Sequence, residues 1–418
     1  MTTNNLPRIL IVGTLPYNPN ESSRALDTYF RGWPKENLRM IFSNADVPMK
    51  GHCSSLFQIT DYDLLQVLKG KTKNPGRAFN YEDLSDTPQH DEKQKLAKFK
   101  KKNTFRFYAR KFLWKKKRWC TSELNQWVDE FKPEAIYICF SDDYFILNIS
   151  YYFAKKYNIP IIAQIGDDYY FRDNKNPLLA PYLKSYKKLF RNIMSLDGFG
   201  VYISQKLADQ YNSHFRLQGH PFYLASAIKE SNQPIRREFN YFGKIALGRD
   251  KALAKLSQIL KKVNPDFALN VYSTDARDKQ KEYLKSNGCN YKGTVPYSDA
   301  ISIMNSGSFN IVASGFSKKD IEQTRYSLST KISDLLSCSG PIIAIGPQGD
   351  GAIDFLSENQ CAFVIDDLDF DFNKLKDFIY DGNRIRAIHD NMKKVSITLF
   401  DFCYNNEKFK RCCMEICK

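Results

Sequence analysis

The chain has 418 residues, of which 43% are hydrophobic and 26% charged, and its formal net charge is +16. These values indicate a globular protein of two or three domains with an anionic partner, such as a nucleotide, a nucleic acid or a phospholipid surface, and they exclude a disordered chain. No apolar run approaches the ~20 residues that span a bilayer, Ile9–Val12 is too short for a signal peptide, and the ten cysteines form neither a disulfide scaffold nor a zinc-like pattern, so we expect a reduced, cytoplasmic protein.

The first half opens with a buried-type strand, Arg8–Gly13, which is followed by a loop and by a helix with an apolar face through Ala25 and Tyr29. A strand, a loop after glycine and a helix are typical of the start of a nucleotide-binding α/β unit. The full Gly-x-Gly-x-x-Gly pattern is absent, so a dinucleotide cofactor is not supported. Residues 69–92 are polar and rich in Lys, Asn, Asp and Pro, which predicts a long exposed loop.

Residues 93–119 combine clustered Lys and Arg with aromatic residues and contain no acidic residue. A basic aromatic helix could lie on anionic lipid, where each cation contributes about 1 kcal/mol. It could also stack on nucleic acid, or be a solvated helix whose aromatic residues pack on their own domain. We favour the membrane surface and expect no nucleic-acid partner, because no nucleic-acid module appears elsewhere. The residues that we expect at the membrane are Trp114, Lys115, Lys116, Lys117, Arg118 and Trp119.

Two further apolar strands, Ala135–Phe140 and Pro160–Ile165, continue the pattern of a parallel sheet. The second strand is followed closely by Asp167 and Asp168, at the edge where parallel sheets bind ligands. This pair could serve catalysis or cap the next helix. The pair Asp142-Asp143, after the preceding strand, is interpreted as a helix start.

Residues 213–238 lose periodicity, so we interpret them as an interdomain linker and His220 within them as part of a hinge. After the linker the α/β rhythm resumes. It is clearest in a helix, a strand, a Gly-rich turn, a helix and a strand at Lys331–Ser337, Pro341–Ile345, Gly346–Gly351, Ala352–Glu358 and Cys361–Ile365.

The Gly-rich turn lies where a strand ends and a helix begins, a place that favours an anion. Lys331 and Asp334 are one helical turn apart, so they share a face on which one could meet a phosphate and the other accept from hydroxyls. An ordinary solvated pair would have the same spacing. The acidic residues Asp366–Asp371 are interpreted as helix-start residues and not as a metal site.

Asp334, followed by Ser339-Gly340-Pro341, resembles the donor-binding segment of GT-B glycosyltransferases, in particular the large retaining family of bacterial polysaccharide enzymes. That family often has two glutamates eight residues apart, where this chain has Tyr326 and Asp334. The resemblance extends strongly over residues 239–366 and less strongly over 135–212. It implies two Rossmann-like α/β domains that face across a cleft.

The resemblance also implies site residues. Asp334 would bind the ribose of the donor, Asp167 would contact the sugar or the acceptor with Asp168 as the alternative, and a cation after Gly243 would clamp the diphosphate. For that cation we favour Arg249 because its fork suits phosphate oxygens, with Lys244 and Lys251 as alternatives. The remaining expected donor-binding residues are Gly13, Thr14, Gly293, Val295, Ser314, Lys331, Gly349, Asp350 and Gly351.

The sequence therefore predicts an N-terminal acceptor domain (1–212), a linker (213–238), a C-terminal nucleotide-sugar domain (239–382) and a helical tail (383–418) that could cross back to the first domain. The expected activity is a hexosyltransferase-type glycosyltransferase that moves a sugar from a nucleoside-diphosphate sugar to a saccharide or lipid-linked acceptor in bacterial surface polysaccharide synthesis. The resemblance alone implies retention of configuration. We expect no metal and no cofactor, and a location at the inner face of the plasma membrane. The alternatives are a GT-B-like epimerase or phosphorylase, or a noncatalytic protein that binds an anionic surface.

Overall fold

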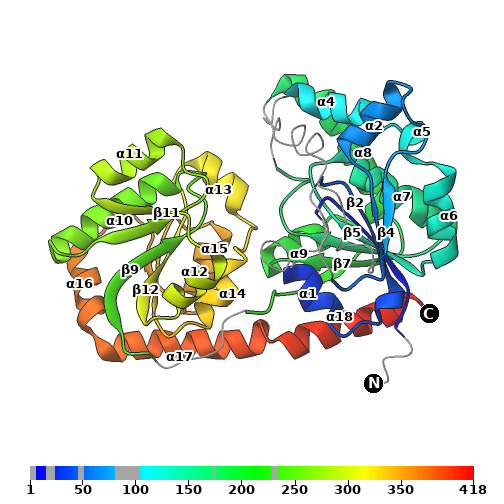
Figure 1. Cartoon of the computed structure of the whole chain (residues 1–418). Helices are drawn as coiled ribbons and strands as arrows, with labels where there is room; N and C mark the ends of the chain where they lie inside the picture. The colour runs from blue at the N-terminus through cyan, green and yellow to red at the C-terminus, as the bar shows by residue number, and fades with distance from the viewer. Residues whose placement is uncertain (1–5, 16–23, 46–50, 81–103, 173–175, 227–232) are drawn as a thin grey trace. The chain divides into compact units, whose positions relative to one another are not determined.

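The computed structural model describes residues 6–15, 24–45, 51–80, 104–172, 176–226 and 233–418. The chain divides into two compact units, residues 1–222 together with 405–418 and residues 223–404. Each unit is a sheet with helices packed around it (Figure 1).

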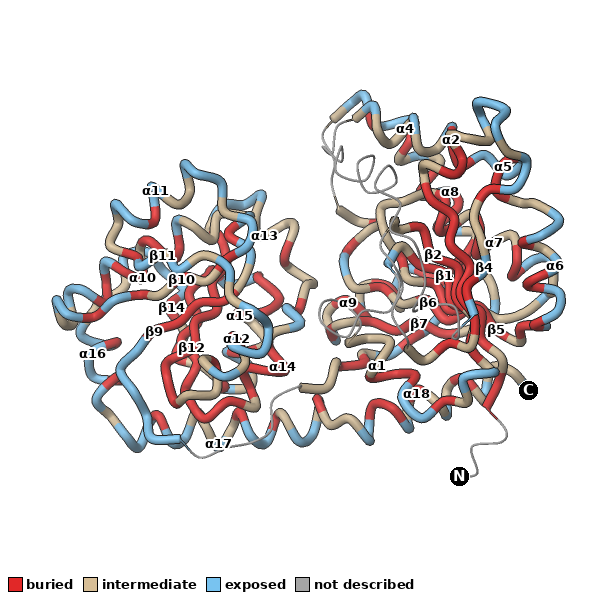
Figure 2. The backbone as a smooth tube through the Cα atoms, in the orientation of Figure 1, coloured by how far each residue is buried: buried red, intermediate tan, exposed pale blue. Residues whose placement is uncertain are grey.

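The sheet of the first unit has the strand order β4-β3-β2-β1-β5-β6-β7-β8. All neighbouring strands are parallel except β4, which is antiparallel to β3. The central strand β1 is buried along its whole length and β5 is buried up to Ile138 (Figure 2), as their continuous apolar sequences predict. The strands are β1 (Ile9–Gly13), β2 (Leu38–Phe42), β3 (Ser55–Gln58), β4 (Arg77–Asn80), β5 (Ala135–Cys139), β6 (Ile161–Ile165), β7 (Gly198–Tyr202) and β8 (Gly219–Pro221).

Three helices of the first unit, α2, α6 and α9, follow polar residues whose side chains satisfy free N–H groups of the first turn. The side chain of Thr60 accepts from the N–H of Asp63, and those of Thr121 and Ser204 do the same for the helices that follow them. The helices are α1 (Arg24–Phe30), α2 (Asp61–Leu68), α4 (Thr104–Leu113), α5 (Lys116–Trp119), α6 (Ser122–Phe131), α7 (Tyr144–Tyr157), α8 (Ala180–Met194) and α9 (Gln205–Asn212).

The sheet of the second unit has the order β11-β10-β9-β12-β13-β14 and is parallel throughout. Its strands are β9 (Arg236–Phe242), β10 (Leu269–Tyr272), β11 (Cys289–Gly293), β12 (Ser308–Ala313), β13 (Ile342–Ile345) and β14 (Phe363–Ile365). Its helices are α10 (Arg249–Val263), α11 (Asp278–Ser286), α12 (Tyr297–Met304), α13 (Lys318–Thr324), α14 (Lys331–Leu336), α15 (Gly351–Glu358), α16 (Phe372–Tyr380) and α17 (Gly382–Leu399).

In both sheets the chain starts in the middle, builds strands to one side and then crosses to the other side. The reversal lies between β1 and β5 in the first unit and between β9 and β12 in the second. At such a switch point the loops after the two strands diverge and leave a crevice at the carboxyl ends, where α/β sheets bind ligands. The two switch points are therefore the places in this fold where a functional site is expected.

The last helix, α18 (Phe402–Ile416), belongs to the first unit from Asn405 onward. The side-chain amide of Asn406 donates to the carbonyl oxygens of Thr28, Tyr29 and Arg31 at the end of α1, at 2.9, 3.1 and 3.2 Å. Phe409 is fully buried and stacks on Tyr29 with ring centroids 5.0 Å apart. Burial of one such ring contributes about 1.5–3 kcal/mol, so α18 is an integral part of the first unit.

Three sequence expectations differ from the structure. The loop expected over 69–92 contains β4, a short edge strand that has no long apolar run. The linker expected over 213–238 contains β8, which carries the exposed His220 and pairs with β7. Strand β8 can lie there because Gly219 has no side chain, and a Cβ atom on it would lie 2.2 Å from the carbonyl oxygen of Gly200. The tail over 383–418 is divided, since α17 stays with the second unit.

Candidate functional site

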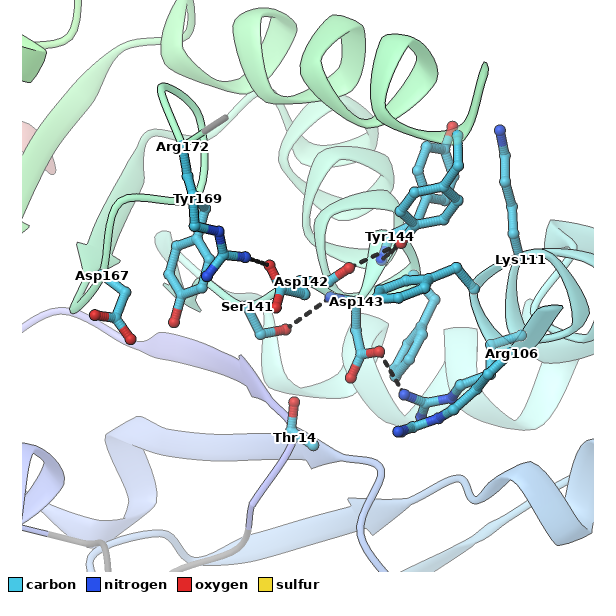
Figure 3. A pocket seen from close by; sticks show the side chains of 14 residues that line it. Thr14, Arg106, Lys111, Ser141, Asp142, Asp143, Tyr144, Asp167, Tyr169 and Arg172 are labelled. Atoms are coloured by element: carbon cyan, nitrogen blue, oxygen red, sulfur yellow. Dashed lines mark hydrogen bonds and ion pairs between the residues drawn. The ribbon is translucent and has the colours of Figure 1, made fainter. Parts of the chain in front are cut away.

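A pocket of about 320 Å³ lies at the switch point of the first unit. Its walls come from the loops after β1, β5 and β6 and from helices α4, α7 and α8 (Figure 3). Carboxylates, arginines and aromatic rings share these walls. Such a mixture can hydrogen-bond hydroxyl groups and pack on the apolar faces of a small polar molecule.

The two aspartates after β6, Asp167 and Asp168, lie in different surroundings. Asp167 is exposed and lines the pocket. Asp168 is buried, and its Oδ1 accepts from the N–H of Phe171 at 2.8 Å and from the hydroxyl of Tyr211 at 3.1 Å. Burial, together with the charge of Asp168, raises the pKa of Tyr211. Asp168 therefore holds the turn together, while Asp167 is the carboxylate that a ligand in the pocket can reach.

Burial and the nearby charges of Asp167 and Asp142 raise the pKa of Tyr169, which lines the same pocket. The phenol therefore stays protonated and can donate a hydrogen bond to a ligand oxygen.

The carboxylates after β5 each meet an arginine across the pocket wall. Asp142 pairs with Arg172 at 2.7 Å, and Asp143 pairs with Arg110, which also reaches Asp61 at 3.0 Å. Burial acts to lower the pKa of Arg110, but the two carboxylates outweigh it and raise that pKa. Interpreting Asp142-Asp143 as a helix start is correct for their position before α7, but it does not predict that their side chains pair with arginines. Asp143 is the N-cap residue of α7, yet its side chain makes no capping hydrogen bond.

Thr14 follows β1, and its side chain points into the pocket (Figure 3). Its hydroxyl oxygen is buried and has no hydrogen-bond partner among the described residues. A buried hydroxyl is costly without a partner, so this group suits a ligand. Gly13 is different, because it is buried in β1 and packs against Cys139.

At the switch point of the second unit, a group of cations surrounds Gly243, the residue after β9. The side-chain nitrogen of Lys331 lies so near Gly243 that a Cβ atom there would be 2.5 Å away. Burial, together with the charges of Arg249 and Lys244, lowers the pKa of Lys331 to about 8. Arg249 is anchored by its Nε, which donates to the carbonyl oxygen of Ala313 at 3.1 Å. Three of the predicted donor-binding cations therefore come together.

Asp334 lies one turn after Lys331 on α14 and is buried. One of its oxygens accepts from the hydroxyl of Ser226 at 3.3 Å, and its charge acts to raise the pKa of Lys331. Lys331 and Asp334 therefore lie one turn apart on α14, as predicted. The carboxylate of Asp334 is buried, and the amine of Lys331 lies near Arg249 and Lys244. Ser314 is also buried, and its N–H donates to Ile345 in the sheet.

The Gly-rich turn before α15 is not an open anion site in this structure. The Oδ1 of Asp350 accepts from the N–H groups of Ala352 and Ile353, at 3.0 and 3.1 Å, and Asp354 accepts from the N–H of Gly349 at 3.0 Å. Asp350 is thus a buried helix cap, and within the Gly-rich turn the N–H of Gly349 already has a carboxylate on it. Gly351 packs against the backbone of Ser327.

The other predicted donor residues have different surroundings. Lys251 is exposed in the wall of a different pocket, together with Lys255 and Tyr283. Gly293 ends β11, with φ +78°, and its carbonyl oxygen accepts from the N–H of Ser273. Val295 follows two residues later and is half-buried. The cap at Asp371 is confirmed, since its side chain accepts from the N–H of Asn373 at 2.9 Å.

The structure corrects part of the expected membrane surface. Trp114 is buried and stacks on Phe145 at 3.8 Å, and Trp119 is fully buried. Arg118 is buried too, and it donates to the carbonyl oxygen of Phe112. These residues belong to the first unit's own packing, because the rings of Trp114 and Trp119 face inward even though other rings of the same segment are exposed. Residues 93–103 lie outside the described part of the chain.

A different set of residues in and between α4 and α5 is exposed to solvent. Lys115, Lys116 and Lys117 are exposed, as are Phe105 at 77% and Phe112 at 48%. Among the described residues, no helix has the length and apolar character needed to cross a membrane. The described part of the chain also contains no group of three His, Cys, Asp or Glu side chains arranged to hold a metal ion.

Comparisons with known proteins identify the architecture. No family model matches the chain, and no curated protein matches it. Solved structures match over nearly the whole chain. Anabaena Alr3699/HepE in complex with UDP has a TM-score of 0.61 and 12% identity, and the match covers 97% of this chain and 98% of that one. The chain has the GT-B glycosyltransferase fold.

Two further GT-B structures match equally broadly. Sucrose-phosphate synthase from Thermosynechococcus elongatus has a TM-score of 0.59 and 11% identity, with 97% of this chain and 98% of that chain covered. A glycosyltransferase from Rickettsia africae has a TM-score of 0.57 and 12% identity, with 98% and 99% covered. In the GT-B fold of this chain, the pocket with Thr14 and Asp167 and the cations around Gly243 occupy the switch points of the two sheets.

Proposed function

We propose that the protein is a glycosyltransferase that moves a sugar from a nucleoside-diphosphate sugar to a saccharide or lipid-linked saccharide acceptor. The observation that carries this proposal is the cation group of Lys331, Arg249 and Lys244 at the switch point of the second sheet, with the buried carboxylate of Asp334 one turn away. Among the neighbours in fold, Anabaena HepE was solved with UDP and with UDP-glucose.

The cations supply what the reaction needs most. When the bond between sugar and diphosphate breaks, negative charge develops on the leaving nucleoside diphosphate. Positive groups held in place before the reaction stabilise that charge without reorganising. Lys331 is partly buried among like charges, so an anion there would relieve an unfavourable arrangement. In this proposal Asp334 accepts hydrogen bonds from the ribose hydroxyls.

The first unit supplies the groups for the sugar and the acceptor. Asp167 is the carboxylate that we place at the reacting sugar or the acceptor hydroxyl, and Thr14 offers a buried hydroxyl in the same pocket. We further propose retention of configuration, independence of metal, and a role in bacterial surface polysaccharide synthesis, on the strength of the sequence resemblance. Unchanged turnover in EDTA would support the proposal on metal.

The test is release of nucleoside diphosphate from UDP-glucose and other sugar nucleotides, with and without saccharide acceptors, followed by analysis of the products. Lys331→Gln should reduce turnover by at least a hundredfold. Lys262→Gln, an exposed lysine on α10, is the control and should leave it unchanged. Formation of a sugar phosphate or an epimer without transfer would replace this proposal with a phosphorylase or an epimerase.

We also propose peripheral attachment to the inner face of the plasma membrane. It is supported by the exposed Lys115, Lys116 and Lys117 beside the exposed rings of Phe105 and Phe112. Lysines near an anionic surface and aromatic rings at its interface both favour binding, and salt screens the charged part.

Cosedimentation with anionic and neutral vesicles at low and high salt tests this attachment. Glutamine at positions 115, 116 and 117 should abolish binding to anionic vesicles. A matched triple variant with Lys155, Lys188 and Lys262 replaced by glutamine changes the net charge equally and should keep it. If both triple variants lost vesicle binding equally, the binding would depend on net charge alone and not on the position of these three lysines.

A further inference from the structure

A pocket of about 410 Å³ lies in the second unit where α16 ends and α17 begins, beside the first residues of β9 (Figure 1). We call it the α17 pocket. It is at the amino end of the sheet, whereas Gly243 and the cations around it are at the carboxyl end. Arg237, in the pocket wall, is the second residue of β9 and Gly243 follows the last, so the strand separates them by about 20 Å. The α17 pocket is therefore a different site from the proposed donor site.

Three basic side chains, Arg237, Arg386 and His389, line the α17 pocket, and none of its described wall residues is acidic. The side chains of Arg386 and His389 have no hydrogen-bond or ion-pair partner among the described residues. Asp381 lies at the start of α17, but its carboxylate accepts from two N–H groups of that helix, at 2.9 and 3.1 Å. No carboxylate in the wall matches its positive charge, and a wall of this kind attracts anions.

Arg237 is held in a position that suits an oxyanion. Its guanidinium carbon lies 4.5 Å from the ring centre of Tyr380. A guanidinium group that lies over a ring keeps the N–H groups at its edge available to bind two oxygen atoms of one anion. A phosphate group presents such oxygen atoms with a full negative charge, so it matches this wall better than a neutral hydroxyl compound does.

The α17 pocket also has apolar walls. Ile379 and Ile385 are buried, while Tyr380 is 50% exposed and Ile235 is 42% exposed. Pockets of roughly 300–1,000 Å³ hold whole small molecules, and the α17 pocket lies within that range. A phosphate ion alone would leave these apolar side chains without a contact. The walls therefore suit a ligand that joins a phosphate group to a ring.

We propose that the α17 pocket binds a phosphate monoester of a ring compound, such as a hexose phosphate or a nucleoside monophosphate. The phosphate group meets Arg237, Arg386 and His389, and the ring packs on Tyr380 and Ile385. This site goes beyond the proposed function and does not depend on it, because it uses none of the residues assigned to the donor or the acceptor.

Titration calorimetry of the full chain at constant ionic strength tests the site. The probes are inorganic phosphate, glucose 1-phosphate, glucose 6-phosphate, AMP and UMP, beside glucose, adenosine and uridine. At least one monoester should bind the native protein tenfold or more tightly than inorganic phosphate and than its own unphosphorylated counterpart. Arg386→Gln should weaken binding of that monoester at least tenfold. Lys394→Gln removes a charge from an exposed position further along α17 and should leave its affinity unchanged.

Lys331→Gln distinguishes the α17 pocket from the donor cations, and it should also leave the affinity for the monoester unchanged. Four outcomes overturn the inference. They are no binding of any monoester, equally tight binding of inorganic phosphate (an adventitious ion only), equal affinities in Arg386→Gln and Lys394→Gln, and loss of binding in Lys331→Gln. UDP and the other nucleoside diphosphates are titrated in the same series. If UDP binds and no monoester does, only this inference fails, whereas binding of a monoester without any nucleoside diphosphate would contradict only the proposed function.

Discussion

The side-chain nitrogen of Lys331 and the backbone of Gly243 lie so close that any side chain at position 243 would collide with the amine, 2.5 Å from the position of its Cβ. Gly243 also has a φ of +149°, which residues with side chains rarely adopt. A glycine directly after β9 thus makes room for a lysine from α14. This contact joins two segments of the proposed donor site that are far apart in the sequence.

Gly243→Ala should therefore displace Lys331 and weaken UDP binding by roughly tenfold or more, since a charged contact is lost. The backbone strain should lower the free energy of unfolding by about 1 kcal/mol. Gly382→Ala is the matched control, because a Cβ atom there meets nothing within 4 Å. Calorimetry of both variants checks the prediction, and unchanged UDP affinity in Gly243→Ala would contradict it.

Lys331 should lower stability near neutral pH. Its folded-state pKa of about 8 lies below the 10.5 of the unfolded chain, so the folded protein binds fewer protons between these values. Its contribution to the free energy of unfolding is therefore unfavourable below pH 8, on the order of 3 kcal/mol, and this penalty fades as the pH rises from about 8 to 10.5. Lys331→Met should be more stable than the native protein at pH 7 and lose that advantage by pH 10.5.

Urea unfolding of both proteins across this pH range measures the difference. A difference that is constant with pH would mean that the amine titrates normally. In parallel, UDP should bind the native protein more weakly as the pH passes 8, because the neutral amine attracts phosphate less.

Asp167 and Asp168 should separate function from stability. Asp168→Ala removes the acceptor for Phe171 and Tyr211 and should lower the free energy of unfolding by about 2 kcal/mol. Asp167→Ala should change it by less than about 0.5 kcal/mol, because the residue is exposed. Asp167→Ala should nevertheless cut sugar transfer at least a hundredfold with nucleotide affinity intact. Transfer rates and urea unfolding of both variants decide the assignment, which is wrong if Asp167→Ala keeps native turnover.

Asn406 should anchor α18 on the first unit. Asn406→Ala leaves the carbonyl oxygens of Thr28, Tyr29 and Arg31 without their donor and should cost about 1–3 kcal/mol. Asn383→Ala, on the exposed start of α17, is the comparison. Equal stability of the two variants would show that the ring of Phe409 holds the helix without help from the amide.

Sequence reasoning predicted the elements whose signals are local. Continuous apolar strands such as Pro341–Ile345 and the pair Lys331 and Asp334, one turn apart on α14, were identified correctly because period and spacing determine them. The short edge strands β4 and β8 were missed, since three or four mixed residues carry no period.

The pocket of the first unit could not be predicted from local sequence patterns. Arg110 meets Asp143 across 33 positions, and such a pairing appears only when the chain has folded. Trp114 and Trp119 were assigned to a membrane because an amphipathic helix does not reveal which partner covers its apolar face. The Gly-rich turn resembles an anion site in sequence, but Asp350 within the turn and Asp354, three residues after it, also accept hydrogen bonds from N–H groups there.

The most direct test of the account is the melting temperature of the native chain with UDP, GDP, ADP, CDP and TDP, each at millimolar concentration, beside Lys331→Gln and Asp334→Ala. A ligand that binds only the folded state raises the melting temperature by mass action. We predict that at least one nucleoside diphosphate raises it by several degrees in the native protein and that the shift is lost in both variants. If no nucleoside diphosphate stabilises the native chain, or if the variants respond as it does, the second unit does not bind the donor as proposed.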